Sequence, residues 1–129
     1  MSLKFHHTEH APAAIGPYSQ AVSAGGFLFT AGQVGLDPAT GEMVGDDCLS
    51  QVVQVMANLR AVLATAGCDF DDVAKTTIFL SDMSDFAVLN EIYGQTMGEH
   101  RPARSTVAAA GLPKGALVEI EMVALLPSS

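Results

Sequence analysis

The spacing of apolar residues along the chain predicts two helices. Between residues 48 and 66 the apolar positions recur every three or four residues, as in a helix with one buried face, and Gly67 is placed to end it. A second, shorter helix is expected to begin near Asp85, which can cap it. Its stripe consists of Phe86, Leu89, Asn90 and Tyr93. Gly94 and Gly98 weaken its end.

Short runs of β-favouring residues predict six strands. These runs cover residues 4–8, 19–24, 27–33, 73–80, 104–110 and 116–126. Gly25 and Gly26 supply the positive φ that a tight hairpin between the second and third strands requires. The resulting order, β-β-β-α-β-α-β-β, indicates one α+β domain over residues 1–129. We expect a mixed sheet with both helices on one face and a partner on the other.

Composition points to self-association. Charged residues make up 16% of the 129 residues, well below the roughly 25% of ordinary soluble domains, so other subunits are expected to cover apolar surface. The net charge of -8 and the scattered Lys and Arg residues disfavour nucleic-acid binding. No apolar run is long enough for a membrane span and no secretory leader is recognisable, so we expect a cytosolic protein.

Metal binding is not indicated by the sequence. The two cysteines, Cys48 and Cys68, lack the spacing of metal ligands, and we expect both to be buried, idle thiols. We therefore expect neither a metal site nor a disulfide.

Two carboxylates share one face of the last predicted strand. Alternation places Glu119 and Glu121 on the same side as Leu117, Val123 and Leu125. A carboxylate in such surroundings must be paired, protonated or held at a cleft, because an unpaired buried charge is costly. A solvent-facing strand with ordinary salt bridges explains the pattern equally well, so both interpretations stay open.

Arg104 stands at the head of the fifth predicted strand and is one of three arginines in the chain. Its forked donors match a carboxylate through two hydrogen bonds. The partner could be a glutamate of a neighbouring strand or the carboxylate of a small anionic ligand. The sequence does not decide between them.

Several short motifs together resemble one known family. They are Ala13-Ala14-Ile15-Gly16-Pro17-Tyr18-Ser19-Gln20, Thr30-Ala31-Gly32-Gln33, Lys75-Thr76-Thr77, Pro102-Ala103-Arg104-Ser105, Leu112-Pro113-Lys114 and Glu119-Ile120-Glu121. In order and spacing this set resembles the RidA/YjgF family over nearly the whole chain. Each string alone would be a weak signal, but the ordered set is specific.

The resemblance implies a fold, an assembly and an activity. The fold would be chorismate mutase-like, with a homotrimeric barrel of sheets, outer helices and clefts between subunits. Deaminases of this family hydrolyse 2-imino and enamine acids, such as 2-aminoacrylate and 2-iminobutanoate, to 2-oxo acids and ammonia. They need no cofactor or metal.

The same resemblance assigns roles to individual residues. Arg104 matches the arginine that holds the substrate carboxylate, and Glu119 matches the glutamate that positions or deprotonates the attacking water. Tyr18, Gly32 and Asn90 match pocket residues. Each of the three also has a simpler explanation: a core or interface aromatic, a site of close strand packing and an exposed helix position, respectively.

Three departures from the family pattern leave the substrate open. Thr106 stands where many deaminases carry a cysteine, Ala31 where many carry a serine, and Arg101 replaces an aromatic residue. Glu121 remains a substitute for Glu119 because both point the same way. The alternatives are a related hydrolase with another substrate, or a non-enzymatic trimer that binds small carboxylates or acts as a translation inhibitor or chaperone.

Overall fold

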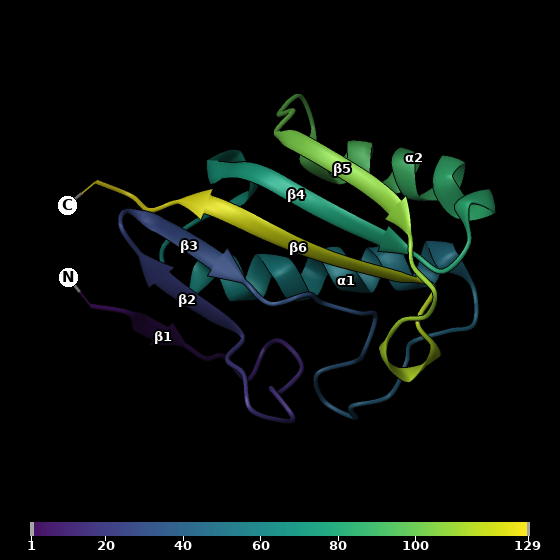
Figure 1. Cartoon of the computed structure of the whole chain (residues 1–129), viewed down its shortest axis with the longest axis horizontal. Helices are drawn as coiled ribbons and strands as arrows, with labels where there is room; N and C mark the ends of the chain where they lie inside the picture. Colours follow the sequence, from purple (N-terminus) through teal and green to yellow (C-terminus); the bar gives the residue numbers. More distant parts are fainter. Residues whose placement is uncertain (1, 129) are drawn as a thin grey trace.

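One six-stranded sheet carries both helices on the same face (Figure 1). The structure is a computed structural model, and it describes residues 2–128. The strands are β1 (Lys4–His6), β2 (Ala21–Ala24), β3 (Phe27–Thr30), β4 (Val73–Leu80), β5 (Ala103–Ala108) and β6 (Val118–Leu125). The helices are α1 (Cys48–Ala64) and α2 (Phe86–Met97), with short 3-10 turns η1 (Phe70–Asp72), η2 (Met83–Asp85) and η3 (Pro113–Gly115). The predicted element order is confirmed.

The sheet is mixed, as the sequence predicted. Its strand order is β1-β2-β3-β6-β4-β5. Neighbouring strands run antiparallel except β4 and β5, which are parallel and are connected through α2. The last strand, β6, lies in the middle of the sheet between β3 and β4, so its residues contact both halves of the domain.

The core lies between the sheet and the helices. The inward face of α1 buries Val52, Val55, Leu59, Val62 and Leu63 completely. These residues belong to the same core cluster as Ile120 and Met122 of β6 and Ile78 and Leu80 of β4. Asp47 caps α1, because its side chain accepts a hydrogen bond from the backbone N–H of Ser50. The periodicity of the sequence therefore identified the buried face correctly.

Several predicted boundaries were too wide. The strand expected over residues 19–24 begins only at Ala21, and the one expected over residues 27–33 ends at Thr30, although Gln33 still pairs with Ile120. The expected ranges 4–8, 48–66, 104–110 and 116–126 are instead 4–6, 48–64, 103–108 and 118–125. Loops bounded by Gly and Pro end most of these elements.

The predicted cap of the second helix was wrong. Asp85 precedes Phe86, but its side chain makes no capping hydrogen bond. The 3-10 turn η2 leads directly into α2, and Asp82 caps that turn by accepting from the backbone N–H of Ser84. The capping carboxylate therefore lies three residues before the predicted one.

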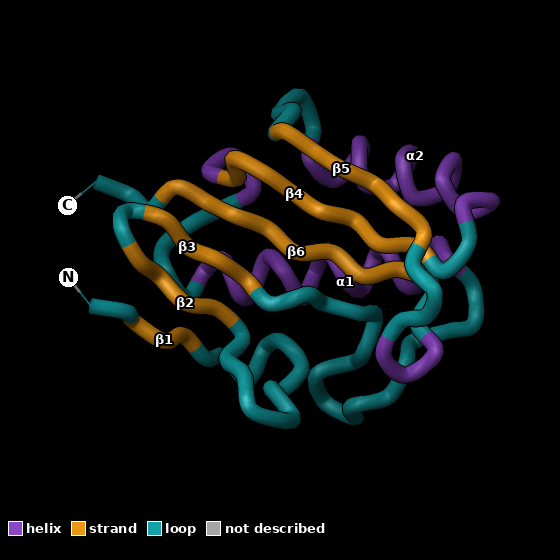
Figure 2. Tube along the Cα trace, viewed as in Figure 1, coloured by secondary structure: helices purple, strands orange, loops and turns teal. Residues whose placement is uncertain are grey.

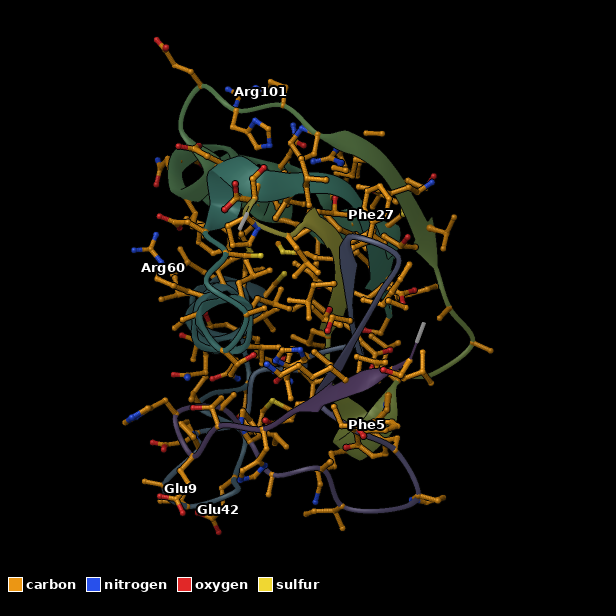
Figure 3. The ribbon with its side chains drawn as sticks, turned by 90° about the vertical axis from the view of Figure 1, so that its left-hand side faces the viewer. Phe5, Glu9, Phe27, Glu42, Arg60 and Arg101 are labelled. Carbon is orange, nitrogen blue, oxygen red and sulfur yellow. The ribbon has the colours of Figure 1, made fainter. Side chains whose placement is uncertain are left out.

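The sheet face opposite the helices is apolar and exposed in the single chain. Phe5 is 65% exposed, Phe29 46% and Leu125 55%. Figure 3 shows Phe5 and Phe27 on the sheet side of the molecule and Arg60 on the outer side of α1. A patch of this kind is unusual for a monomer. No helix among residues 2–128 is both long and apolar enough to cross a membrane.

Candidate functional site

Glu119 lies on the sheet face away from the helices. It pairs with Phe79 of β4, whereas the neighbouring residues Val118 and Ile120 point into the core. The side chain is partly buried. Burial raises the pKa of the Glu119 carboxyl above its ordinary value of 4.5, and the nearby charge of Glu121 raises it further. A carboxylate so placed holds and releases a proton closer to neutral pH.

Gly32 provides the surface on which the Glu119 carboxylate rests. A Cβ atom at Gly32 would lie 2.8 Å from both Cδ and Oε2 of Glu119, which is closer than carbon atoms approach each other. The chain passes this point between the end of β3 and the pairing of Gln33 with Ile120. Gly32 is therefore both a site of close packing and a pocket residue, because in both cases its neighbour is the Glu119 side chain.

A cavity of about 540 Å³ opens in front of Glu119. Three loops form its walls, and Figure 2 shows these loops at one end of the sheet. The lining residues named by the sequence are Tyr18, Ala31 and Gly32, together with Glu119 itself. Tyr18 is 55% exposed, so it is no core residue. Glu121 is not part of the lining.

Gln20 holds the loop that carries Tyr18, and sequence reasoning missed this role. The Gln20 side chain is buried, and its Nε2 donates to the carbonyls of Thr8 (3.0 Å) and Pro12 (2.8 Å). Its Oε1 accepts from the N–H of Thr8 at 2.7 Å. Its backbone carbonyl accepts from the N–H of Ala31. One glutamine therefore joins two walls of the cavity. Its position at the end of an apolar motif was the feature of the sequence that could have indicated this role.

Arg104 lies on the other face of the sheet, next to α2. It pairs with Thr76 of β4, which is buried. Its guanidinium carbon is 5.2 Å from the ring centroid of Tyr93 and 5.7 Å from that of Phe86. These aromatic faces orient the cation and leave its edge donors available. The Tyr93 hydroxyl is held by Thr76 Oγ1 at 3.0 Å.

A second cavity, of about 320 Å³, adjoins Arg104. Its lining consists of Asn90, Tyr93, Gly94, Arg101, Pro102 and Arg104. Asn90 is exposed and joins this cavity rather than the one at Glu119. Thr106 follows Arg104 by two residues and lies on the same face of β5. Its Oγ1 is buried and has no hydrogen-bond partner within residues 2–128.

The two principal residues do not meet within one chain. Strand alternation places Arg104 with Thr76 on the helix face, and Glu119 with Phe79 on the opposite face. An ion pair between Arg104 and a β6 glutamate is therefore wrong for the single chain. The sequence assigned both residues to one site, and the structure separates them into two cavities, one containing the acid and the other the guanidinium.

The cysteines and possible metal ligands lie outside this arrangement. Cys48 and Cys68 are buried and, in the described part of the chain, unpaired. Burial raises the pKa of the Cys48 thiol to about 11, so little of the reactive thiolate forms at neutral pH. Among residues 2–128 no cluster of three or more His, Cys, Asp or Glu side chains could hold a metal ion.

Comparison with known proteins places the chain among well-defined relatives. The Endoribonuclease L-PSP family matches residues 8–126. A RutC family protein of Synechocystis is 54% identical over 130 residues, covering 99% of this chain and 100% of the relative. The 2-iminobutanoate/2-iminopropanoate deaminase of mouse is 48% identical, covering 92% and 87%. Escherichia coli TdcF, crystallised with bound serine, is 41% identical with a TM-score of 0.91, covering 96% and 99%.

Proposed function

Since the chain belongs to the Endoribonuclease L-PSP family, as its RidA/YjgF motifs predicted, we propose that it hydrolyses 2-imino and enamine acids to 2-oxo acids and ammonia. The observation that carries this proposal is the pair of complementary cavities. One presents a stacked guanidinium and the other a carboxyl group with a raised pKa. The mouse relative's name and the serine bound to TdcF support a small amino-acid-like substrate.

We propose further that each site is completed between neighbouring subunits of a homotrimer. Arg104 and Glu119 lie on opposite faces of one sheet, so a substrate that contacts both needs two chains. The exposed apolar face around Phe29 and Leu125 supplies the surface for such an association. Closure with threefold symmetry makes every site identical.

In the proposed reaction Arg104 binds the substrate carboxylate through two hydrogen bonds and thereby fixes the imine carbon. Glu119 accepts a proton from water as the water oxygen forms a bond to that carbon. The electron pair of the C=N bond moves to nitrogen, which takes from Glu119 the proton that the carboxylate had received, and an NH2 group results. Glu119 then accepts the hydroxyl proton of the carbinolamine and passes it to this NH2 group. The C–N bond breaks as the C=O bond forms, and ammonia leaves. The carbonyl of the 2-oxo acid remains.

Thr106, Tyr18 and Asn90 also have roles in the proposed reaction. The unpaired Thr106 hydroxyl lies beside Arg104 and can bond to the bound carboxylate. Tyr18 covers the substrate from the Glu119 side, where Ala31 leaves additional space. Asn90 contributes an amide at the Arg104 side. No step requires a metal or a cofactor. We propose a cytosolic location, as expected from the sequence.

The description of the family as endoribonuclease does not suit this chain. A net charge of -8 repels a polyphosphate backbone. The cationic cavity is small and lies beside α2 rather than along an extended groove. RNA would need a basic, elongated surface. A small anionic substrate is therefore the better fit.

A subunit-mixing experiment tests the proposal. Arg104→Ala and Glu119→Ala are each expected to abolish hydrolysis of 2-iminobutanoate generated in situ by a threonine dehydratase. When the two variants are co-expressed in equal amounts with different tags, random assembly of a cyclic trimer gives about a quarter of the sites both native groups. Activity should return to about that fraction of the wild-type value.

Two results would contradict the proposal. If trimers shown to contain both tags stay inactive, the sites are not formed between subunits. If the wild-type protein accelerates neither 2-iminobutanoate nor 2-aminoacrylate hydrolysis, the activity is wrong, and a binding or regulatory trimer takes its place. Oligomeric state, measured by light scattering, serves as the control in both cases.

A further inference from the structure

A second guanidinium lines the cavity that contains Arg104. Arg101 precedes β5 and is exposed, and its Nη1 donates to the carbonyl oxygens of His100 (3.0 Å) and Gly98. Figure 3 shows Arg101 at the end of the molecule where β5 begins. The chain has six Lys and Arg residues in total, and two of them line this one small cavity. Such a concentration of positive charge is unexpected in a chain with a net charge of -8.

Both positive charges act on Tyr93, a residue that lines the cavity. Burial raises the pKa of the Tyr93 hydroxyl, which is bonded to the buried Thr76 side chain. The hydrogen bond from Thr76 and the charges of Arg104 and Arg101 oppose that increase. Arg101 therefore contributes to the field within the cavity although its side chain lies at the rim. An anion larger than one carboxylate would be attracted by both guanidinium groups.

We propose that Arg101 binds a second carboxylate, so that the preferred substrates are 2-imino acids with an acidic side chain. This inference rests on the proposed function and names its substrate class. Arg104 holds the carboxylate next to the imine carbon, and Arg101 holds the one at the end of the side chain. The cavity of about 320 Å³ has room for a dicarboxylic acid of four or five carbons.

The hydrogen bonds of Arg101 favour this role. Both bonds come from Nη1 and fix the guanidinium against the carbonyl oxygens of Gly98 and His100. Arg101 also lines the cavity. A guanidinium has five N–H donors, so those of Nη2 and Nε remain for a ligand. A fixed cation loses less conformational entropy when it binds a carboxylate than a freely moving one.

A purely structural role for Arg101 gives a different expectation. Gly98 ends α2, and a cation near the carboxyl end of a helix stabilises that helix. If this were the only role, removal of Arg101 would lower thermal stability and would reduce activity on all substrates equally. The two roles are therefore separated by comparing substrates that differ only in the second carboxylate.

The test compares the imine of glutamate with that of norvaline, which has the same carbon chain and no side-chain carboxylate. A broad-specificity amino-acid oxidase with catalase generates both imines, and their hydrolysis is followed against semicarbazide trapping. Arg101→Gln should lower kcat/KM for the glutamate-derived imine roughly tenfold or more and change that for the norvaline-derived imine less than about twofold. Arg101→Lys should recover part of the loss, and the melting temperature should be nearly unchanged.

A binding measurement keeps this inference separate from the proposed activity. Calorimetric titration with 2-oxoglutarate and with 2-oxopentanoate should show tighter binding of the dicarboxylate by the wild-type protein, and Arg101→Gln should remove the preference. Equal losses for both substrates, or no preference in binding, would overturn the inference. A binding preference without hydrolysis of any imine would support the role of Arg101 and reject the deaminase function.

Discussion

The cavity at Glu119 and the cavity at Arg104 are formed by different kinds of structural element. Loops between β1 and β2, after β3 and around η3 form the walls of the first, and a single buried glutamine fixes two of them. The second is formed by a helix and the start of a strand, and aromatic rings orient its cation. Glu119 itself projects from the central strand β6, but its carboxyl group lies against Gly32, where one added methyl group would disturb it. The cation is held by the aromatic rings of α2.

This difference suits the two roles proposed for these residues, substrate binding by Arg104 and proton transfer by Glu119. A substrate-holding cation needs a fixed position, which regular elements supply well. A group that exchanges protons needs a shifted pKa, and partial burial with a nearby like charge provides that shift. The two lie on opposite faces of one sheet, so in the proposed reaction they act together only through the proposed association between chains. Five substitutions test this comparison.

The largest effect is expected from Phe29→Asp on the exposed sheet face. Phe29 is 46% exposed between β2 and β6. A charge there should prevent association, because the surface would bury an unpaired carboxylate, and all hydrolysis should stop with it. Light scattering and the imine assay check the result. Leu49→Asp, at a position 49% exposed on α1, is the matched control and should retain both. Active monomers of Phe29→Asp would disprove the two-chain site.

Gly32→Ala is expected to have the next largest effect. The new Cβ would lie 2.8 Å from Cδ and Oε2 of Glu119, so the carboxylate must move. A displacement of this size at a reacting group can reduce kcat/KM about a hundredfold. Gly111→Ala is the control, since nothing lies within 4 Å of its added Cβ. Wild-type kinetics in Gly32→Ala would mean that the position of Glu119 is unimportant.

Glu121→Gln should change the pH dependence of activity rather than its maximum. The charge of Glu121 contributes to the raised pKa of Glu119, although burial is the larger cause. A general base must be ionised, so activity falls as the pH drops through that pKa. Removing the Glu121 charge should shift the acidic limb of the profile to lower pH. Glu42→Gln, in an exposed turn, should leave it in place.

The raised pKa of Glu119, which favours proton transfer near neutral pH, lowers the stability of the folded protein at that pH. Since the pKa of Glu119 is higher in the folded than in the unfolded chain, the native state binds the proton more tightly. The resulting stabilisation is complete below the pKa that Glu119 has in the unfolded chain. It is lost as the pH rises through the pKa that Glu119 has in the folded chain. Glu119→Gln should therefore raise the melting temperature relative to wild type near pH 7, and the gain should vanish in acid.

Thr106→Val should have the smallest effect. The buried Thr106 hydroxyl lacks a partner within residues 2–128. An isosteric apolar side chain should stabilise the ligand-free protein by about 1 kcal/mol, measured by denaturant unfolding. The KM for the imine should rise because one donor to the carboxylate is lost. A loss of stability would instead indicate that a neighbouring chain supplies the partner.

Much of the fold could be predicted from the sequence because periodicity reports burial directly. The buried face of α1 and the alternation of Glu119 with Ile120 along β6 follow from local spacing. The shortened β2 could not be predicted in this way. Its start depends on Gln20, whose side chain bonds to a loop distant in sequence.

Residues named from the sequence line both cavities, but their division between two cavities was not predicted. The face on which Arg104 lies depends on the parallel register of β5 with β4, which local patterns do not determine. One signal was available: Phe86 and Tyr93 share a helical stripe, and both rings contact Arg104. The stripe was recognised from the sequence, but its support of the cation was not predicted.

The contact between Gly32 and Glu119 also limits the order in which mutations at these two positions can accumulate. Any side chain at position 32 collides with the carboxyl group of a glutamate at position 119. Cγ of Glu119 would lie 2.9 Å from the added Cβ, so an aspartate in the same place would still collide. Only a side chain that ends at Cβ removes the contact, and it removes the carboxyl group as well. The two positions therefore form an epistatic pair, in which a change at position 119 must come first and its cost must be tolerated before position 32 becomes free to vary.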